Sequence, residues 1–228
     1  MRITEAYVGE YASGKSENAV CRALSLARAG RQVTLVDLDL VEPCYTLRSL
    51  IDPLEAQGVQ VLAWRPEQTF GLGEAGQTLL PAARWALRRE GDIIFDVGYG
   101  VGGASILNLI EGVAEEPNFR IIVVANFSRP ILASPQALKD YIRELGGADG
   151  IIANTHMGAE TQPKHVLEGF RKAKQVADEL GIPLEAVSVS SEFLNRYPAF
   201  CQREDYKESG ADGYPLRVIE RVLPQGFW

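Results

Sequence analysis

Short apolar segments alternate with longer amphipathic segments along most of this sequence, and the alternation limits the folds open to the chain. The expected strands are residues 3–8, 32–37, 59–63, 92–96, 120–126, 150–154 and 186–189. The expected helices are residues 15–29, 46–57, 75–89, 104–113, 135–145 and 163–180. Strands joined through helices form βαβ units and a parallel sheet. We therefore predict a three-layer α/β/α protein with a mostly parallel central sheet of about seven strands.

The domain organisation follows from the length and the absence of a linker. A chain of 228 residues is long enough for one such domain, and no Ser-, Gly- or Pro-rich stretch divides it. We predict a single domain over residues 1–228. The pattern weakens over residues 195–228, which are expected to pack across the sheet edge or to form a small helix over residues 215–222.

A glycine-rich segment directly after the first expected strand matches G-x-x-x-x-G-K-[ST]. It consists of Gly9, Glu10, Tyr11, Ala12, Ser13, Gly14, Lys15 and Ser16, and a helical pattern continues into Glu17. Glycines let the backbone N–H groups curve around a phosphate, and the helix N-terminus adds its positive dipole end. Lys15 can then reach the β- and γ-phosphates, and the Ser16 hydroxyl can ligate Mg²⁺. The motif predicts a P-loop NTPase fold that binds nucleotide through residues 9–17.

Three carboxylates follow two further expected strands. Asp37 and Asp39 end the second strand, and Asp96 ends the fourth and is followed by Gly98. Each acid alone could cap a helix or close a turn. In an open α/β sheet, however, ligands bind at the carboxyl ends of the strands, so all three acids are expected near the phosphate loop. We predict that Ser16, Asp37 and Asp96 hold Mg²⁺.

With these motifs the sequence resembles the MinD/ParA (CobQ/CobB/MinD/ParA) group of P-loop ATPases, and within it a bacterial branch with G-x-x-x-S-G-K-S-E, D-L-D and D-V-G motifs. The likeness extends to about Ser191. It implies ATP and Mg²⁺ as cofactors and a nucleotide-driven switch that acts on a protein partner. It implies that Lys15 binds the phosphates and that Asp39 positions the attacking water, which makes them the catalytic residues. It also implies that Asn154 reads adenine and that Pro183 helps to form the other wall of the base pocket.

One residue departs from the family's pattern. Dimerising members carry a second lysine directly after the first glycine of the loop, whereas this chain has Glu10. A carboxylate facing a triphosphate repels it unless the carboxylate turns to solvent or to a partner's cation. A homodimer stays open, but this chain has no lysine at that position to assist hydrolysis in the other subunit.

Alternative functions stay open at this point. One is an ATP-dependent ligase or kinase that acts on a small molecule, similar to dethiobiotin synthetase, and another is a nucleotide sensor without turnover. An acceptor pocket would have to use cations without another role, namely Arg48, Arg129 and Lys164. Adenine is expected over guanine because the sequence has no N-K-x-D motif.

Residues 71–76 match G-x-G-x-x-G, a dinucleotide-binding pattern, but Pro66 separates them from the preceding strand and Glu74 would face the pyrophosphate. In a nucleotide switch, residues 64–76 and 98–103 could rearrange with the γ-phosphate. Unchanged protease sensitivity of both segments on nucleotide binding would exclude this hypothesis.

The net charge of −7, from 23 basic and 30 acidic residues, argues against nucleic acid as a partner. No apolar run approaches the ~20 residues of a membrane-spanning helix, so no stable membrane insertion is expected. The three cysteines, Cys21, Cys44 and Cys201, are far apart in the sequence and fit reduced thiols in the cytoplasm. The two histidines, His156 and His165, are too few and too distant from the acids to suggest a zinc site.

Overall fold

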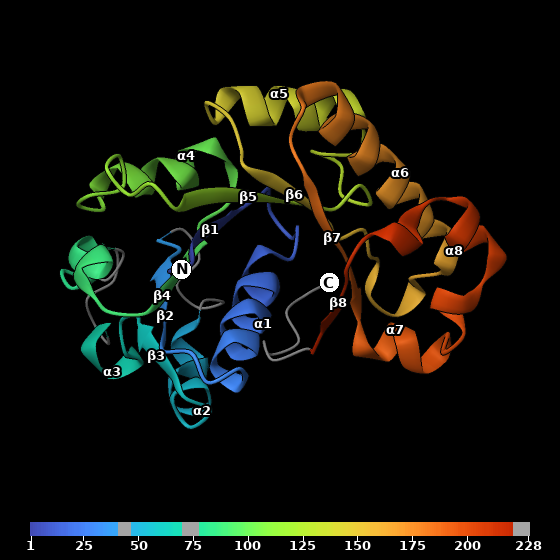
Figure 1. Cartoon of the computed structure of the whole chain (residues 1–228). Helices are drawn as coiled ribbons and strands as arrows, with labels where there is room; N and C mark the ends of the chain where they lie inside the picture. The colour runs from blue at the N-terminus through green and yellow to red at the C-terminus, as the bar shows by residue number, and fades with distance from the viewer. Residues whose placement is uncertain (41–46, 70–77, 221–228) are drawn as a thin grey trace. The chain divides into compact units, whose positions relative to one another are not determined.

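The computed structural model describes residues 1–40, 47–69 and 78–220. By their internal contacts these residues form two compact units (Figure 1). Unit 1 contains residues 1–8 and the described part of residues 15–120, and unit 2 contains residues 9–14 and 121–220. A single domain over residues 1–228 stays a prediction.

The sheet of unit 1 consists of parallel strands in the order β3-β2-β4-β1. Their bounds are Thr4–Val8 for β1, Val33–Leu38 for β2, Val59–Leu62 for β3 and Asp92–Val97 for β4. All residues of β1, β2 and β4 are buried, and most of them are apolar, as expected for strands covered on both faces. The register places Asp37 of β2 directly beside Asp96 of β4. The acids predicted from the motifs therefore meet at the same edge of the sheet.

The helices of unit 1 are shorter than predicted, except α1. Their bounds are Lys15–Arg28 for α1, Leu47–Leu50 for η2, Ile51–Glu55 for α2, Pro66–Thr69 for α3, Ala83–Arg88 for η4, Gly100–Ala104 for α4 and Ser105–Leu109 for η5. The predicted helix over residues 46–57 is divided at residue 50, because Pro53 must lie in the first turn of an α-helix. In the predicted helix over residues 75–89, Pro81 disfavours helical backbone before it, and only Ala83–Arg88 is helical among the described residues. The helix predicted over residues 104–113 instead runs as α4 and η5 and ends before Gly112, whose φ is +85°.

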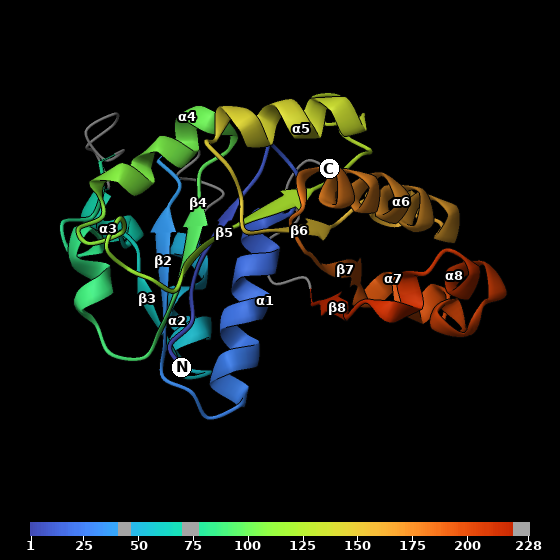
Figure 2. The same ribbon diagram turned by 45° about the horizontal axis from the view of Figure 1, so that its top comes forward.

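The sheet of unit 2 consists of parallel strands in the order β5-β6-β7-β8. Their bounds are Phe119–Ala125 for β5, Gly150–Ala153 for β6, Leu184–Ser190 for β7 and Leu216–Ile219 for β8. Helices α5 (Pro135–Glu144) and α6 (Pro163–Leu180) lie beside each other, and α6 packs on β6 and β7 (Figure 2). Both helices begin with proline at the first position, and α6 ends at Gly181 with a φ of +67°. These local signals explain why both helices agree with their predicted bounds.

The helix predicted over residues 215–222 is wrong, because Leu216–Ile219 forms strand β8 along the outer side of β7. The segment between β7 and β8 contains α7 (Ser191–Arg196), η7 (Phe200–Gln202), α8 (Glu204–Glu208) and η8 (Ala211–Gly213). Aromatic rings hold this segment together, since Phe200 packs on Phe193 and on Tyr206 with ring centroids 5.0 and 4.9 Å apart. The closing Phe227-Trp228 pair lies outside the described residues.

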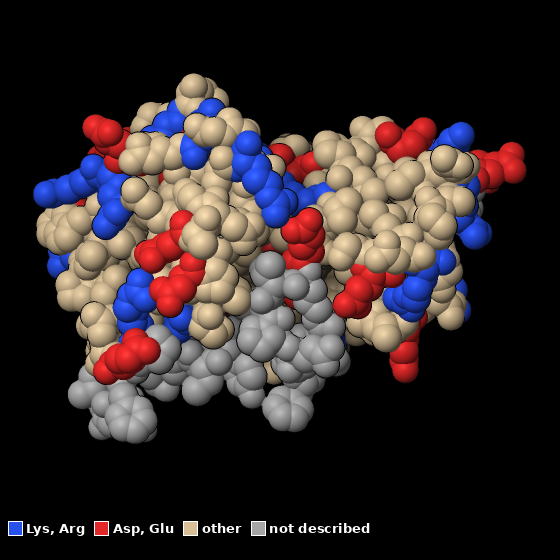
Figure 3. Space-filling view, turned by 90° about the horizontal axis from the view of Figure 1, so that it is seen from below, with Lys and Arg blue, Asp and Glu red and all other residues tan. Residues whose placement is uncertain are grey.

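The predicted α/β class with parallel strands is confirmed, and the described residues contain eight strands rather than about seven. In the part of the chain that the structure describes, no helix has the length and apolar composition needed to cross a bilayer. Basic and acidic side chains are interspersed over the described part of the face in Figure 3.

Candidate functional site

The phosphate-loop residues of unit 2 form a tight turn. The N–H group of Ser13 donates to the carbonyl of Glu10 at 3.1 Å, and both Ala12 and Gly14 have positive φ angles, 55° and 86°. A Cβ atom on Gly9 would lie 2.5 Å from the Ser13 Oγ and 2.7 Å from the Val124 carbonyl oxygen, so only glycine fits there. A non-glycine residue with positive φ is uncommon and marks local strain of the kind found at ligand-binding loops.

Two asparagines at the ends of neighbouring strands hold this loop. Asn154, directly after β6, donates from Nδ2 to the carbonyl of Ser13 at 2.7 Å. Asn126, directly after β5, donates to the carbonyl of Ala12 at 3.4 Å and to that of His156 at 3.1 Å. These hydrogen bonds satisfy two loop carbonyls, and successive backbone N–H groups in a loop of this kind can bind an anion. Asn126 was missed by the motif analysis, although Ala-Asn follows both apolar strands and was a usable signal.

The predicted base-binding residues are not brought together. Asn154 has its amide nitrogen on the loop carbonyl, and its reading of adenine stays a prediction. Pro183 precedes β7, and its carbonyl accepts a hydrogen bond from the N–H of Ile151 near the beginning of β6. Because the strands are parallel, Pro183 lies at the amino end of this sheet and Asn154 lies at the carboxyl end. The expectation that both line one pocket therefore has no support in the geometry.

The acids of unit 1 are arranged by β2, β4 and the segments after them. Asp37, Asp39 and Asp96 are 6%, 7% and 0% exposed. The Oδ1 atom of Asp37 accepts a hydrogen bond from the N–H of Asp39 at 3.0 Å, which fixes the chain as it leaves β2. All three carboxylates predicted from the sequence thus lie in the interior at the carboxyl ends of the strands.

Two buried cations accompany these acids. The Lys15 Nζ is 3.9 Å from the Asp39 Oδ2, and the Arg48 Nε is 3.9 Å from the Asp37 Oδ2. Both basic side chains are 9% exposed, so solvent screens these charges weakly. The sequence identified Arg48 only as a cation without a role, because no motif links Arg48 to Asp37.

Asp96 differs from its neighbours. Both of its carboxylate oxygens are buried, and neither has a hydrogen-bond partner among the described residues. The pKa of Asp96 is raised to about 8, and burial is the largest cause; the Lys15 ammonium and the Ser16 hydroxyl act to lower it, and the charges of Asp37 and Asp39 act to raise it. A buried carboxyl group without a partner is costly, which indicates a place for a cation.

The residues present fit Mg²⁺ as a partial site, in which the protein supplies only a few of the ligands. Among the described residues, no group of three or more His, Cys, Asp or Glu side chains is arranged to hold a metal by itself. Mg²⁺ usually takes only one or two carboxylates and completes its shell with water and phosphate oxygens. Asp96 and Ser16 provide that kind of partial site.

The glycines after β4 bring the next segment against Asp39. A Cβ atom on Gly98 would lie 3.3 Å from the Asp39 Oδ1, and one on Gly103 would lie 2.5 Å from the Gly98 carbonyl. Only glycine at residue 103 allows this approach. The hypothesis that residues 98–103 respond to the γ-phosphate stays open, and most of the other expected switch segment, 64–76, lies outside the described residues.

Further candidates from the sequence are residues 71–76, the three cysteines and the two histidines. The G-x-G-x-x-G match at residues 71–76 and Cys44 lie outside the described residues. Cys21 and Cys201 are free thiols. His156 and His165 belong to unit 2 and are both half-buried.

The sequence matches no protein-family model, and no curated protein is similar to it. The structure is similar to cell division protein FtsY from Thermotoga maritima, with 17% identity, a TM-score of 0.51 and coverage of 81% of this chain and 60% of that chain. It is also similar to signal recognition particle receptor FtsY from Elizabethkingia anophelis in complex with GDP, with 14% identity, a TM-score of 0.53 and coverage of 81% and 56%. A third similar structure is chloroplast FtsY from Physcomitrella patens, with 18% identity, a TM-score of 0.51 and coverage of 81% of this chain and 57% of that chain.

The chain thus spans about three fifths of the length of these structures. Likeness at this level of identity is informative about the fold and not about the reaction. Together with the loop and the order of the strands, it leads to one conclusion: the chain has the α/β fold of P-loop NTPases.

Proposed function

We propose that the protein is a Mg²⁺-dependent ATPase of the MinD/ParA type, which binds ATP through residues 9–16 and acts as a switch on a protein partner. The observation that carries the proposal is the buried Asp96 carboxyl group, which has no hydrogen-bond partner among the described residues although Lys15 and Ser16 influence its pKa. A fold of this class tolerates such a group where a bound cation supplies the missing partner.

Each part of the site has a chemical role in this proposal. The backbone N–H groups of the loop bind the phosphates, and Lys15 binds the β- and γ-phosphate oxygens. Ser16, Asp37 and Asp96 would hold Mg²⁺. The ion, when bound, neutralises charge that develops on the phosphates.

Asp39 is the residue proposed to orient the attacking water. Its carboxylate lies 3.9 Å from the Lys15 ammonium, so Asp39 is held by an ion pair. When Lys15 moves to the phosphates, the Asp39 carboxylate becomes available to accept a hydrogen bond from water. The same residue pair therefore supports both a resting arrangement and a reactive one.

Dimerisation belongs to the proposal as well. Burial is the larger cause that raises the pKa of the Tyr141 phenol on α5, and the charge of Glu10 raises it as well. Glu10 therefore lies close to Tyr141. The carboxylate at the position of the family's second lysine thus has an electrostatic neighbour on α5. A homodimer that forms without a lysine from the partner is compatible with this arrangement.

The test is ATP binding and turnover by the purified protein with and without Mg²⁺, over a range of protein concentrations and with GTP as competitor. We expect slow Mg²⁺-dependent hydrolysis and weak competition by GTP. Turnover per molecule that rises with protein concentration supports a dimerising switch. Tight binding without turnover would contradict the ATPase proposal and favour a sensor or an enzyme that needs an acceptor, and preference for GTP would contradict the assignment of adenine.

A further inference from the structure

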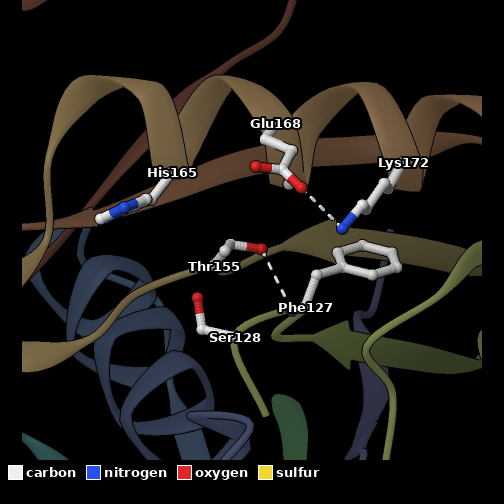
Figure 4. A pocket seen from close by; sticks show the side chains of 7 residues that line it. Phe127, Ser128, Thr155, His165, Glu168 and Lys172 are labelled. Carbon is white, nitrogen blue, oxygen red and sulfur yellow. Dashed lines mark hydrogen bonds and ion pairs between the residues drawn. The ribbon is translucent and has the colours of Figure 1, made fainter. Parts of the chain in front are cut away.

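Unit 2 contains a hollow of about 170 Å³ between helix α6 and the ends of strands β5 and β6 (Figure 4). Side chains spaced three and four residues apart on α6 form one wall, namely His165, Glu168 and Lys172. Residues one or two positions after the two loop-holding asparagines form the other wall, namely Phe127, Ser128 and Thr155. None of these residues belongs to the site described above.

The two walls are held close together by specific contacts. Gly169 lies in the middle of α6, where a Cβ atom would be 2.0 Å from the Thr155 Oγ1. Glycine in a helix interior costs about 1 kcal/mol relative to alanine, so its presence has to be offset by this close approach. The Thr155 Oγ1 also accepts a hydrogen bond from the N–H of Phe127 at 3.2 Å, which joins the ends of β5 and β6. The hollow is therefore a defined feature of this packing.

The charged side chains at the hollow are paired with each other. The Lys172 Nζ lies 2.8 Å from the Glu168 Oε1 and 5.7 Å from the centre of the Phe127 ring (Figure 4). The hydrogen bond from Lys172 is the largest cause that lowers the pKa of Glu168, so the carboxylate is ionised at neutral pH. One cation and one anion thus stand side by side at the hollow.

Several polar groups at the hollow have hydrogen-bonding capacity that the described residues do not use. The Ser128 hydroxyl has no hydrogen bond there, and the Thr155 hydroxyl accepts one and has its proton to donate. The His165 Nδ1 accepts from the N–H of Gln162, so the neutral ring carries its proton on Nε2. Glu168 has its second oxygen left as an acceptor. The hollow therefore offers hydroxyl donors on Ser128 and Thr155 and an acceptor oxygen on Glu168.

We propose that this hollow binds a small carboxylic acid that also carries an amino or hydroxyl group. The carboxylate of the ligand accepts hydrogen bonds from Ser128, Thr155 and Lys172, and its amino or hydroxyl group donates to Glu168. Drug-sized ligands occupy pockets of roughly 300–1,000 Å³, so a hollow of about 170 Å³ takes a molecule smaller than a nucleoside.

The position of the hollow connects it to the phosphate loop. Phe127 and Thr155 directly follow Asn126 and Asn154, whose amides hold the loop carbonyls. The N–H of Ser128 also donates to the Asn126 Oδ1 at 3.0 Å. A ligand on Ser128 and Thr155 is therefore expected to change the affinity of the loop for nucleotide, an effect that rests on the proposed function.

Binding is tested by NMR titration of the full chain with L-serine and L-lactate, with acetate and ethylamine as compounds that each lack one group. We expect saturable shifts of the Thr155 and Gly169 amides with the two bifunctional compounds. Ser128→Ala and Lys172→Met are expected to weaken binding by about tenfold or more, because each removes a donor to a charged ligand. Lys174→Met is the matched control, since it removes another i,i+4 ion pair of α6, with Asp178, and is expected to bind as the wild type.

Absence of saturable shifts with both bifunctional compounds would overturn the proposal. So would unchanged affinity in both Ser128→Ala and Lys172→Met, or acetate binding as tightly as L-serine and L-lactate. The coupling is tested separately by the ATP affinity with and without saturating L-serine. If L-serine binds and the ATP affinity is unchanged, the coupling fails while the binding site stands; if ATP does not bind at all, the proposed function fails and the titration still decides on the hollow.

Discussion

Strand ends in the two units carry different polar groups, carboxylates in unit 1 and carboxamides in unit 2. The amides of Asn126 and Asn154 are hydrogen-bonded to backbone carbonyls of the loop. The carboxylate oxygens of Asp96 are equally buried but have no hydrogen-bond partner among the described residues. A buried amide is stable once its hydrogen bonds are formed, whereas a buried carboxylate needs a cation or a proton. The amides therefore shape the loop, and the acids provide for a ligand.

The largest effect is expected when Lys15, the cation beside the acids of unit 1, is removed. Lys15→Ala is expected to lower ATP affinity by about 100-fold or more, because two charge-assisted contacts to phosphate are lost. Isothermal titration with Mg²⁺-ATP measures the effect. Lys174→Ala, on the surface of α6, serves as the control. If Lys15→Ala binds ATP as tightly as the wild type, then Lys15 and the acids beside it do not form the nucleotide site.

Asp39→Ala sharpens the contrast by separating binding from chemistry. The variant removes the partner of Lys15 at 3.9 Å, so ATP affinity is expected to stay the same or to rise. Turnover is expected to fall by about 100-fold, because the water loses the group that orients it. Steady-state hydrolysis measures this, with Asp52→Ala as the control, since that side chain is 81% exposed. Hydrolysis at the wild-type rate in Asp39→Ala would refute the role of this residue.

The metal-free protein is expected to lose stability as the pH rises, because of Asp96. Its pKa of about 8 in the folded state lies above the ordinary value of 3.8, so the folded state holds a proton that the unfolded state releases between these values. The stabilisation is complete below pH 4 and disappears as the pH rises through 8. The Asp96→Asn variant has no carboxyl group to titrate, so it does not lose this stability. Above pH 8 in the presence of chelator, its free energy of unfolding should exceed that of the wild type by on the order of a few kcal/mol.

Thermal denaturation of both proteins between pH 5 and 9 provides the measurement. In Mg²⁺-ATP the wild type is expected to be more stable than Asp96→Asn, because the ligand stabilises only the protein that has the carboxylate. An equal pH dependence in Asp96→Asn and the wild type would show that Asp96 is not the titrating group.

The smallest expected effect concerns the amides. Asn154→Ala leaves the Ser13 carbonyl in the interior without its 2.7 Å hydrogen bond, so the free energy of unfolding should fall by about 1–2 kcal/mol. Urea denaturation measures the change, and the exposed Asn195→Ala is the control. No loss of stability in Asn154→Ala would mean that this amide does not support the loop.

Most strands and the long helices followed from local sequence signals. Helices α5 and α6 have proline at their first position, and α6 also has a glycine cap at its end, features that act over a single turn. Shorter helical segments were less predictable. Pro53 and Pro81 restrict where such a helix begins, and the segment at residues 216–219 became a strand because β7 offers an open edge.

The sequence by itself determined the parallel α/β class, the phosphate loop and the acids at the strand ends, because each depends on neighbouring residues and on periodicity. Tertiary structure alone decided that Asn126 holds the loop and that Arg48 lies beside Asp37. It also decided that Pro183 and Asn154 lie at opposite ends of the strands. It also decided that Gly169 and Thr155 enclose a polar hollow. These arrangements join residues from separate segments, and only the order and register of the strands bring such residues together.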